Sequence, residues 1–284
     1  MYDLIIIGAG PAGISAGLYA KRANLNVLII YKGISNLEKA EKIENYYGFP
    51  DGISGTDLYN DGIKQAKNLG IDLKEEEVLN IVKNEDNLFE ITTNEGSYSG
   101  KACIIATGNK KLKPNIKGID EFEGRGISYC AICDGFFYRN KEVVVIGNGK
   151  FAIHEANDLK NIAKKITILT NGEDFNLDTE YEIIDKKIKE ISGENRVSKI
   201  EFMDGSSIDA NGVFIALGEA GGADFAKKLG VMLDKDNIIV NEKMETNIEG
   251  LYSCGNSTGG LLQVCKAVYE GGKAGLSVIE YLRK

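Results

Sequence analysis

The sequence is poor in histidine, in positive charge and in long apolar runs, and each shortage argues against a class of function. Its 284 residues include one histidine, and Asp plus Glu outnumber Lys plus Arg by 42 to 34, for a net charge of −8. An acidic protein binds nucleic acid or an anionic membrane surface only through a local basic patch. No apolar run approaches the roughly 18 residues of a membrane span, and no basic-then-apolar leader precedes the strand-like run 2–7. We therefore expect a soluble protein of the reducing cytoplasm.

One pattern, a buried strand followed by a glycine-rich turn, a helix and a second strand, occurs twice. The first copy covers residues 4–30 with its turn at Gly8–Gly13, and the second covers residues 142–169 with its turn at 147–152. Continuous Ile and Val runs are typical of parallel strands buried on both faces, and a helix between two such strands makes a βαβ unit. The sequence therefore predicts an α/β fold with two doubly wound domains of the nucleotide-binding type.

Two further strand-to-glycine turns indicate how these domains are connected. The run 103–108 ends a buried strand, and the segment 109–118 after it, with four lysines and a proline, is typical of a linker. Beyond the second copy, the segment 250–255 is again a strand ending at a glycine turn, and a helix over 262–282 follows it. We predict that one domain is inserted in the other: residues 1–112 and 243–284 form the first, and residues 113–242 form the second.

The first glycine loop has the context of a dinucleotide-binding site. Its glycines permit a tight turn, a close approach of the backbone to a pyrophosphate, and close packing of the helix on the strand, while the helix N-terminus faces the anion. A tight turn without a ligand is the alternative. An acid usually ends the second strand of such a unit to hold the ribose, but Tyr31 and Lys32 stand there instead.

A close cysteine pair, Cys130 and Cys133, precedes the second glycine loop. Two intervening residues let the sulfurs form a small disulfide ring and place one thiol at a helix start, where a thiolate is favoured. A structural zinc site usually takes four Cys or His ligands, and the chain has no second cysteine pair and only His154. The pair is therefore interpreted as redox-active, with an inert pair as the alternative. The other three cysteines have apolar or small neighbours and are expected to be buried packing residues: Cys103, Cys254 and Cys265.

These motifs together resemble the low-molecular-weight thioredoxin reductases over nearly the full length of the chain. The resemblance lies in Gly8–Gly13, in the run 44–50 (ENYYGFP), in 106–108, in 130–139 (CAICDGFFYR), and in Gly255-Asn256 with Gln263 downstream. It implies an FAD-dependent enzyme that reduces the disulfide of thioredoxin, in a protein that is usually a homodimer.

The resemblance also implies a role for each matching residue. Cys133 is expected to face the flavin, Cys130 to attack the partner disulfide, and Asp134 to act as the acid and base that moves a proton. The alternative for Asp134 is a helix N-cap or first-turn acid. The expected FAD-binding residues are Gly8, Gly10, Pro11, Ala12, Gly13, Tyr31, Asn45, Val78, Ala106, Thr107, Gly108, Gly255, Asn256, Gln263 and Val264.

The second glycine loop departs from the family's NADPH site. The family has a run of arginines after the second strand of this unit, and these hold the 2′-phosphate of NADPH by paired hydrogen bonds. Here the segment 167–174 contains no basic residue and ends in Glu173 and Asp174. Phe151 stands in the loop where small residues are usual, and we expect it to crowd the loop. A later signature, usually Gly-x-x-Pro-Asn, is replaced by residues 218–222.

We therefore expect the electron donor to be reduced ferredoxin, and a lysine cluster could dock such an acidic partner: Lys110, Lys111, Lys113 and Lys117. The alternative for these lysines is a solvated linker. Four alternatives for the protein remain open: an NADPH-dependent reductase that has drifted in sequence, an NADH-dependent one with Glu173 or Asp174 on the ribose, an oxygen-dependent dithiol oxidase, and a non-catalytic flavin-binding redox sensor.

Overall fold

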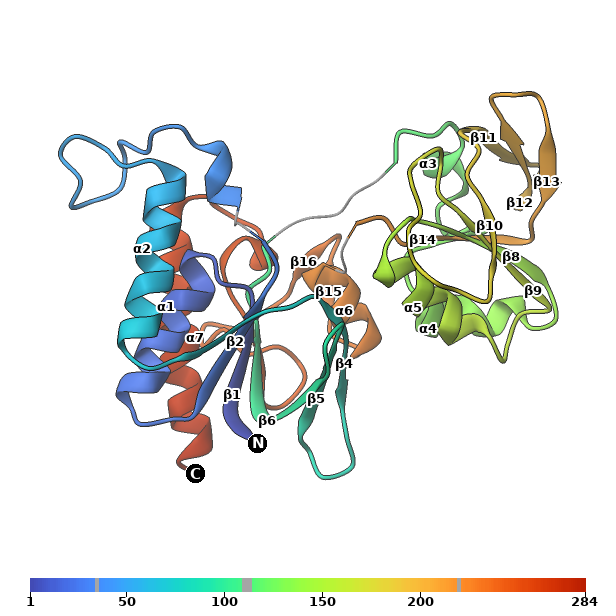
Figure 1. Cartoon of the computed structure of the whole chain (residues 1–284). Helices are drawn as coiled ribbons and strands as arrows, with labels where there is room; N and C mark the ends of the chain where they lie inside the picture. Colours follow the sequence, from blue (N-terminus) through green and yellow to red (C-terminus); the bar gives the residue numbers. More distant parts are fainter. Residues whose placement is uncertain (34–35, 109–113, 219–220) are drawn as a thin grey trace. The chain divides into compact units, whose positions relative to one another are not determined.

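The computed structural model describes residues 1–33, 36–108, 114–218 and 221–284, which form two compact units (Figure 1). Unit 1 consists of Met1–Lys110 and Gly221–Lys284, and unit 2 consists of Lys111–Ala220. The chain therefore leaves the first unit, builds the second and returns. Two doubly wound α/β units, one inserted in the other, are the architecture that the repeated pattern predicts.

Unit 1 is built on a seven-stranded sheet. Its strands in spatial order are β3 (Asp72–Glu75), β2 (Val27–Tyr31), β1 (Tyr2–Ile7), β6 (Ser97–Ile105), β5 (Phe89–Thr93) and β4 (Val78–Lys83), and β17 (Leu251–Ser253) also pairs with β6. The first four and β17 are parallel, whereas β4 and β5 form an antiparallel extension of β6. The apolar runs of β1 and β2 pair directly, from Leu4 with Val27 to Ile7 with Ile30, and these residues are buried.

The helices and small elements of unit 1 are α1 (Pro11–Arg22), η1 (Asn36–Lys39), α2 (Gly55–Asn68), α6 (Gly222–Lys228), β15 (Leu233–Asp234), β16 (Asn237–Ile238), η3 (Gly255–Thr258) and α7 (Val264–Leu282). Helices α1 and α7 lie side by side in Figure 1 and approach very closely. A Cβ on Gly271 would stand 2.1 Å from the carbonyl oxygen of Ala12, and one on Gly275 would stand 2.6 Å from that of Ala16. Small residues on both helices therefore make this contact possible.

The return into unit 1 falls at Gly221, and the expected boundary near residue 243 is corrected. The start of α6 packs on the end of β6, because a Cβ on Gly222 would stand 2.7 Å from Oγ1 of Thr107 and 3.0 Å from Cγ2 of Ile105. Residues 218–222 were interpreted as the place where the family's later signature is lost. The last two of them, Gly221 and Gly222, are the N-cap and the first residue of α6 in the first unit. Glu219 and Ala220 lie outside the described residues.

Unit 2 has a parallel five-stranded sheet and a small antiparallel one. The parallel strands in spatial order are β10 (Glu182–Ile184), β9 (Lys165–Leu169), β8 (Glu142–Ile146), β14 (Gly212–Ile215) and β7 (Ile127–Ser128). The antiparallel strands are β11 (Ile188–Gly193), β12 (Val197–Phe202) and β13 (Ser207–Asp209), and the helices are α3 (Ile119–Phe122), α4 (Ala131–Asp134), η2 (Gly135–Tyr138) and α5 (Lys150–Leu159). Among the helices in the described ranges, none has the length and apolar character of a membrane span.

Candidate functional site

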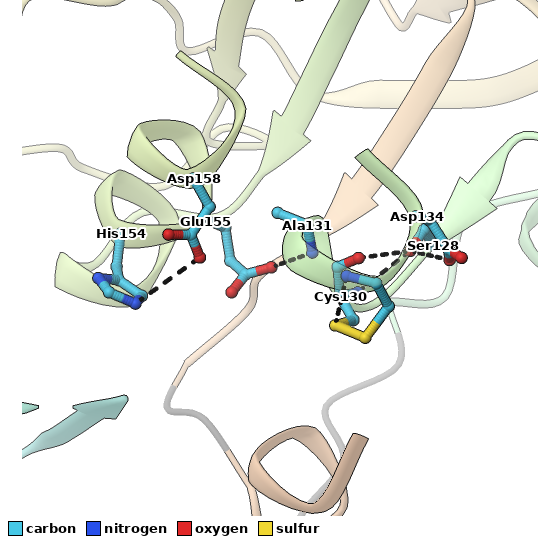
Figure 2. The surroundings of a disulfide bond; sticks show 8 residues. Ser128, Cys130, Ala131, Asp134, His154, Glu155 and Asp158 are labelled. Carbon is cyan, nitrogen blue, oxygen red and sulfur yellow. Dashed lines mark hydrogen bonds and ion pairs between the residues drawn. A yellow bond between two sulfur atoms is a disulfide. The ribbon is translucent and has the colours of Figure 1, made fainter. Parts of the chain in front are cut away.

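Cys130 and Cys133 form a disulfide at the start of α4 (Figure 2). Cys130 is the N-cap residue of this short helix, and the backbone N–H of Cys133 points at Sγ of Cys130 at 3.2 Å. Cys133 is exposed, whereas Cys130 is 2% exposed. Cys130, which was expected to attack the partner disulfide, is therefore the buried cysteine of the pair in the oxidised protein. Within the described residues, no group of three or more Cys, His, Asp or Glu is arranged to hold a metal ion.

Asp134 is linked to the cysteine pair through Ser128. The Ser128 hydroxyl donates to Oδ2 of Asp134 at 2.6 Å and accepts the backbone N–H of Cys130 at 3.1 Å (Figure 2). Asp134 lies in the first turn of α4, and its backbone N–H donates to the carbonyl of Cys130 at 3.2 Å. The carboxylate of Asp134 is therefore connected to the backbone of Cys130 through one hydroxyl group, that of Ser128. Sequence reasoning missed Ser128, although its place two residues before the pair was a usable signal.

Glu155 is a second residue that sequence reasoning missed. It is 1% exposed and comes from α5, the helix that follows the second glycine loop. Its Oε2 accepts the backbone N–H of Ala131 at 2.7 Å, so a buried carboxylate contacts the residue next to Cys130. The sequence offered no signal for this contact, because 24 residues separate the two partners.

The three remaining cysteines lie in unit 1 and are unpaired. Cys103 and Cys254 are buried as expected, and burial raises the pKa of the Cys103 thiol to about 12 and that of Cys254 further still. Cys265 is exposed, which corrects the expectation for it. The buried stripe of α7 runs through Ala267, Gly271, Ala274 and Val278, and Cys265 lies off that stripe.

The residues expected to bind FAD gather at one edge of the sheet of unit 1. Because β1, β2, β6 and β17 are parallel, their carboxyl ends meet at this edge, where Gly8, Tyr31, Ala106 and Gly255 end or follow them. Thr107 and Gly108 continue from Ala106, Asn256 follows Gly255, and Val264 begins α7. Two long-range contacts join the segments: the Asn45 side chain donates to Oε1 of Gln263 at 3.1 Å, and the Gly108 N–H donates to the Ser257 hydroxyl at 3.1 Å.

The first glycine loop has the geometry that a pyrophosphate requires. Gly8 has a φ of +110°, and a Cβ on it would stand 2.4 Å from the carbonyl oxygen of Ala106. A Cβ on Gly13 would stand 1.9 Å from the carbonyl oxygen of Gly8, so the helix packs against the turn only because this residue is glycine. Helix α1 begins at Pro11 after the N-cap Gly10, with neither a side-chain cap from the described residues nor an acid in its first turn. The positive end of α1 therefore faces the loop without an acid in its own first turn.

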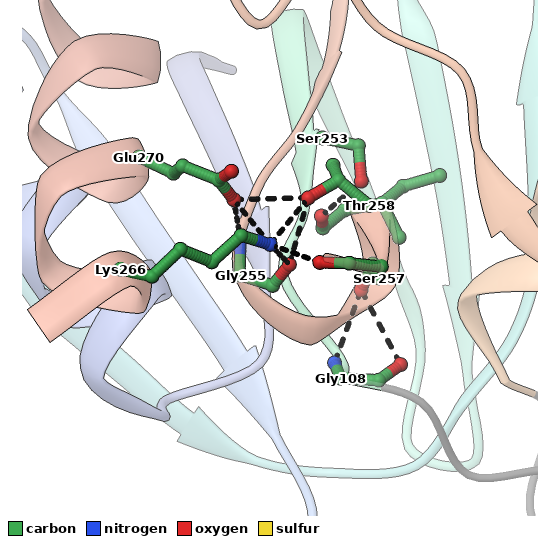
Figure 3. Close-up of polar contacts among 9 residues, drawn as sticks. Gly108, Ser253, Gly255, Ser257, Thr258, Lys266 and Glu270 are labelled. Carbon is green, nitrogen blue, oxygen red and sulfur yellow. Dashed lines mark hydrogen bonds and ion pairs between the residues drawn. The ribbon is translucent and has the colours of Figure 1, made fainter. Parts of the chain in front are cut away.

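The turn after β17 is held by a partly buried ion pair that the sequence did not reveal (Figure 3). Nζ of Lys266 donates to the carbonyl of Gly255 at 2.8 Å and to the hydroxyl of Thr258 at 2.9 Å, and lies 3.0 Å from Oε2 of Glu270. Oε2 of Glu270 in turn accepts the backbone N–H of Gly255 and the hydroxyl of Thr258, each at 2.9 Å. The two side chains are 14% and 13% exposed. They clamp the segment that carries Gly255 and Asn256.

The acid that usually ends the second strand of a dinucleotide-binding unit is absent from β2, but another segment brings a carboxylate, that of Glu77, to this place. Lys32 follows Tyr31 and pairs with Oε2 of the buried Glu77 at 2.9 Å. Glu77 immediately precedes Val78 and follows β3, whose last residue pairs with Tyr31. Val78, which the sequence assigned to FAD binding, is therefore brought to the same edge. Burial raises the pKa of the Tyr31 phenol.

The turn after β9 is built without a basic side chain. Asn171 has a φ of +57°, and its Oδ1 accepts the backbone N–H of Ile188 at 2.8 Å, while Glu173 and Asp174 are exposed.

The expectation for Phe151 is corrected. This residue is 2% exposed and packs in the core of unit 2 among the side chains of β8, α5 and β14, so it does not crowd the glycine loop.

The expected docking lysines are only partly described. Lys110, Lys111 and Lys113 lie outside the described residues. Lys117 is described, and its exposed ammonium lies 2.6 Å from Oε2 of Glu190 in unit 2. This lysine is thus already paired within the protein.

Comparison with known proteins identifies relatives along the whole chain. The chain matches the family of pyridine nucleotide-disulphide oxidoreductases over residues 2–271. It is 33% identical over 305 residues to thioredoxin reductase of Listeria monocytogenes, with 100% of this chain and 95% of that protein covered.

Two solved structures resemble the protein closely. The atypical thioredoxin reductase TRi of Desulfovibrio vulgaris Hildenborough has a TM-score of 0.94 and 37% identity, with 100% of this chain and 98% of that chain covered. A ferredoxin-flavin thioredoxin reductase of Clostridium acetobutylicum has a TM-score of 0.75 and 35% identity, with 99% and 98% covered.

Proposed function

The chain belongs to the pyridine nucleotide-disulphide oxidoreductases and, within them, to the thioredoxin reductases, and from this premise we propose that it reduces thioredoxin with electrons from reduced ferredoxin rather than from NADPH. Members of this family are FAD-containing enzymes that act on a disulfide. The observation that carries the proposed donor is the turn 170–174, which has two exposed acids where the family has arginines. The proposal also places the enzyme in the cytoplasm as a homodimer.

The sheet edge of unit 1 fits FAD. The positive end of α1 and the close turn at Gly8 would hold the pyrophosphate, and the turns at Thr107–Gly108 and Gly255–Asn256 would contact the ribityl and ring portions. Bound FAD supplies two electrons for the reduction of a disulfide and accepts electrons one at a time from its donor. The clamp of Lys266 and Glu270 would keep the second of these turns in place for the cofactor.

The cysteine pair carries the electrons to the partner. Two electrons and two protons convert the Cys130–Cys133 disulfide to a dithiol. We assign to Cys130 the attack on a sulfur of the partner disulfide. A mixed disulfide forms, and the partner's other sulfur leaves as a thiolate and takes a proton. Cys133 then attacks Cys130, which restores the Cys130–Cys133 disulfide and releases the partner as a dithiol. We assign the transfer of that proton to Asp134, whose carboxylate accepts a hydrogen bond from Ser128. Since Cys130 is 2% exposed in the oxidised protein, this assignment requires its sulfur to become accessible after reduction.

The absence of basic residues in the segment 170–174 should lower the affinity for NADPH strongly. A hydrogen bond between charged groups contributes about 1.5–3 kcal/mol, and about 1.4 kcal/mol corresponds to a tenfold change in affinity. Two missing arginine contacts therefore weaken binding by at least about a hundredfold, and Glu173 and Asp174 would repel the 2′-phosphate further. One solved relative is named a ferredoxin-flavin thioredoxin reductase, which supports the proposed donor.

A donor screen tests the proposal. The purified protein is mixed anaerobically with reduced ferredoxin, NADPH or NADH, and loss of flavin absorbance is followed with time. We expect rapid bleaching by reduced ferredoxin and slow or no bleaching by micromolar NADPH, because only the nicotinamide site has lost its contacts. Rapid bleaching by NADPH with none by ferredoxin would contradict the proposal. Oxygen consumption with a dithiol, measured in parallel, tests the oxidase alternative.

One observation favours NADPH as a second candidate donor. Lys187 is exposed, and its Cβ lies 3.5 Å from the place of a Cβ on Gly172, so a basic residue borders the turn from outside the segment 170–174. A lysine offers a point charge and not the paired hydrogen bonds of arginine. If NADPH is the donor, replacing Lys187 with Gln should raise the KM for NADPH but not that for NADH.

We propose that the two exposed aromatic residues that follow the cysteine pair in the chain contact thioredoxin. Phe136 and Phe137 follow α4 directly and are 68% and 64% exposed. Replacing both with Ala should lower kcat/KM for thioredoxin about tenfold or more, since an aromatic anchor at an interface contributes about 2 kcal/mol. Flavin reduction by the donor should not change. Met203→Ala is the matched control, because Met203 is a 65% exposed apolar residue after β12. Equal losses in both variants would exclude a specific docking role.

A further inference from the structure

Glu155 connects the helix of the second glycine loop to the cysteine pair. Its carboxylate accepts the N–H of Ala131, the first amide of α4, at 2.7 Å (Figure 2). Ala131, Ala152, Ala156 and Leu159 are each fully buried, so the contact lies within a packed apolar cluster away from water. The carboxylate therefore acts at low dielectric, where a charge has a large effect on its neighbours.

Without Glu155, the start of α4 would stabilise a thiolate on Cys130 after reduction. Cys130 is the N-cap residue, and its sulfur already lies 3.2 Å from the backbone nitrogen of Cys133. A free helix start favours a thiolate through its unpaired N–H groups. Here Glu155 takes the amide of Ala131 and adds a negative charge beside the position of the thiolate. The loss of this amide as a donor and the nearby negative charge of Glu155 both disfavour a thiolate on Cys130.

Other titratable groups also lie near the start of α4. Asp134 is on α4 itself and is hydrogen-bonded to Ser128, and Tyr138 of η2 packs in the same core cluster. On α5, Nε2 of His154 lies 3.7 Å from Oδ2 of Asp158. Of the described carboxylates, Glu155 is the one for which a hydrogen bond to an α4 amide beside Cys130 is seen, which singles it out.

We propose that Glu155 is a positioning residue that makes the Cys130–Cys133 dithiol a stronger reductant. A disulfide carries no charge, so the carboxylate acts mainly on the reduced form, and destabilising the Cys130 thiolate favours transfer of its electrons to the partner. Glu155 lies on α5, the helix that follows the second glycine loop, and on this proposal it tunes the reducing strength of the cysteine pair. This inference rests on the proposed thiol–disulfide function but is independent of the electron donor.

The test measures the thiol–disulfide equilibrium of the whole FAD-containing protein. Parent and Glu155→Gln are equilibrated anaerobically in mixtures of reduced and oxidised dithiothreitol, quenched with acid and alkylated. The tryptic peptide 126–139 holds both cysteines and no others, so its mass reports the fraction reduced. Gln keeps the length of the side chain and an oxygen for the Ala131 amide, but it removes the charge.

We expect Glu155→Gln to be about tenfold easier to reduce, which corresponds to a reduction potential about 30 mV more positive. Glu155→Asp keeps the charge and should stay within about threefold of the parent. Asp158→Asn removes one charge from the same helix without touching Ala131 and should change the equilibrium less than twofold. An unchanged equilibrium in a Glu155→Gln protein with native circular dichroism and bound FAD overturns the proposal, and so does an equally large shift in Asp158→Asn.

This measurement uses neither thioredoxin nor ferredoxin. Failure of the proposed donor therefore leaves the result unaffected. A pair that stays oxidised in every dithiothreitol mixture, in the parent as well, would instead count against the thiol–disulfide function itself and with it this inference.

Discussion

Replacement of either Cys130 or Cys133 with serine should abolish steady-state reduction of thioredoxin. The reaction needs one sulfur to form the mixed disulfide and a second to resolve it, and the two sulfurs are joined in the oxidised protein. A serine hydroxyl does neither. The loss should reach the rate without enzyme, as measured by the appearance of free thiols in thioredoxin.

The two variants should differ in what they trap. Cys133→Ser leaves Cys130 without a resolving partner, so it should accumulate a stable mixed disulfide with thioredoxin, seen as an adduct on a non-reducing gel. Cys130→Ser leaves Cys133, which should alter the flavin absorbance as a thiolate near the ring.

The opposite pattern would mean that the exposed Cys133 is the attacking thiol, in line with the burial of Cys130. Cys265→Ser is the control for a single Cys-to-Ser change, because Cys265 is exposed and unpaired, and it should retain turnover.

Replacement of Lys266 with Met should destabilise unit 1 by up to about 3 kcal/mol, the lower end of the cost of removing one partner of a fully buried ion pair, because Lys266 and Glu270 are only partly buried. Lys266 also holds two backbone carbonyls of the turn after β17, and Glu270 would lose its counter-charge while it still accepts the Gly255 N–H. The affinity for FAD should fall together with stability. Urea unfolding of the FAD-free protein and titration with FAD measure the two effects separately.

Lys273→Met is the matched control for this variant. Lys273 lies on the same helix, and its ammonium stands 5.5 Å from the centre of the exposed Tyr269 ring, so its replacement should change stability by less than about 1 kcal/mol. The double variant Lys266→Met with Glu270→Met should cost less than the sum of the two single changes, because no unpaired, partly buried charge remains. Equal unfolding midpoints for Lys266→Met and Lys273→Met would show that the pair does not hold the turn.

The sequence by itself determined the two βαβ units, the sheet edge where the residues expected to bind FAD gather, and the cysteine pair. These features depend on residues that are close along the chain: the loop at Gly8–Gly13, the run around Cys130, and apolar strands whose parallel pairing brings Gly8, Ala106 and Gly255 to one edge. Local spacing and the handedness of the crossover are sufficient for such inferences. They did not extend to α2, β3, β4 and β5, which lie between the recognisable motifs and which the sequence reading did not assign.

Only the tertiary structure decided which side chains support the site. Glu155 contacts Ala131 because α5 packs on α4, and Ser128 joins Asp134 to the backbone of Cys130. Lys266 and Glu270 reach the turn after β17 because α7 packs against it. The return of the chain at Gly221 was decided in the same way, by the packing of Gly222 on the end of β6. The physical reason is common to most of these: a motif is a short-range pattern, whereas a buried charge is placed by whichever segment the fold brings against it.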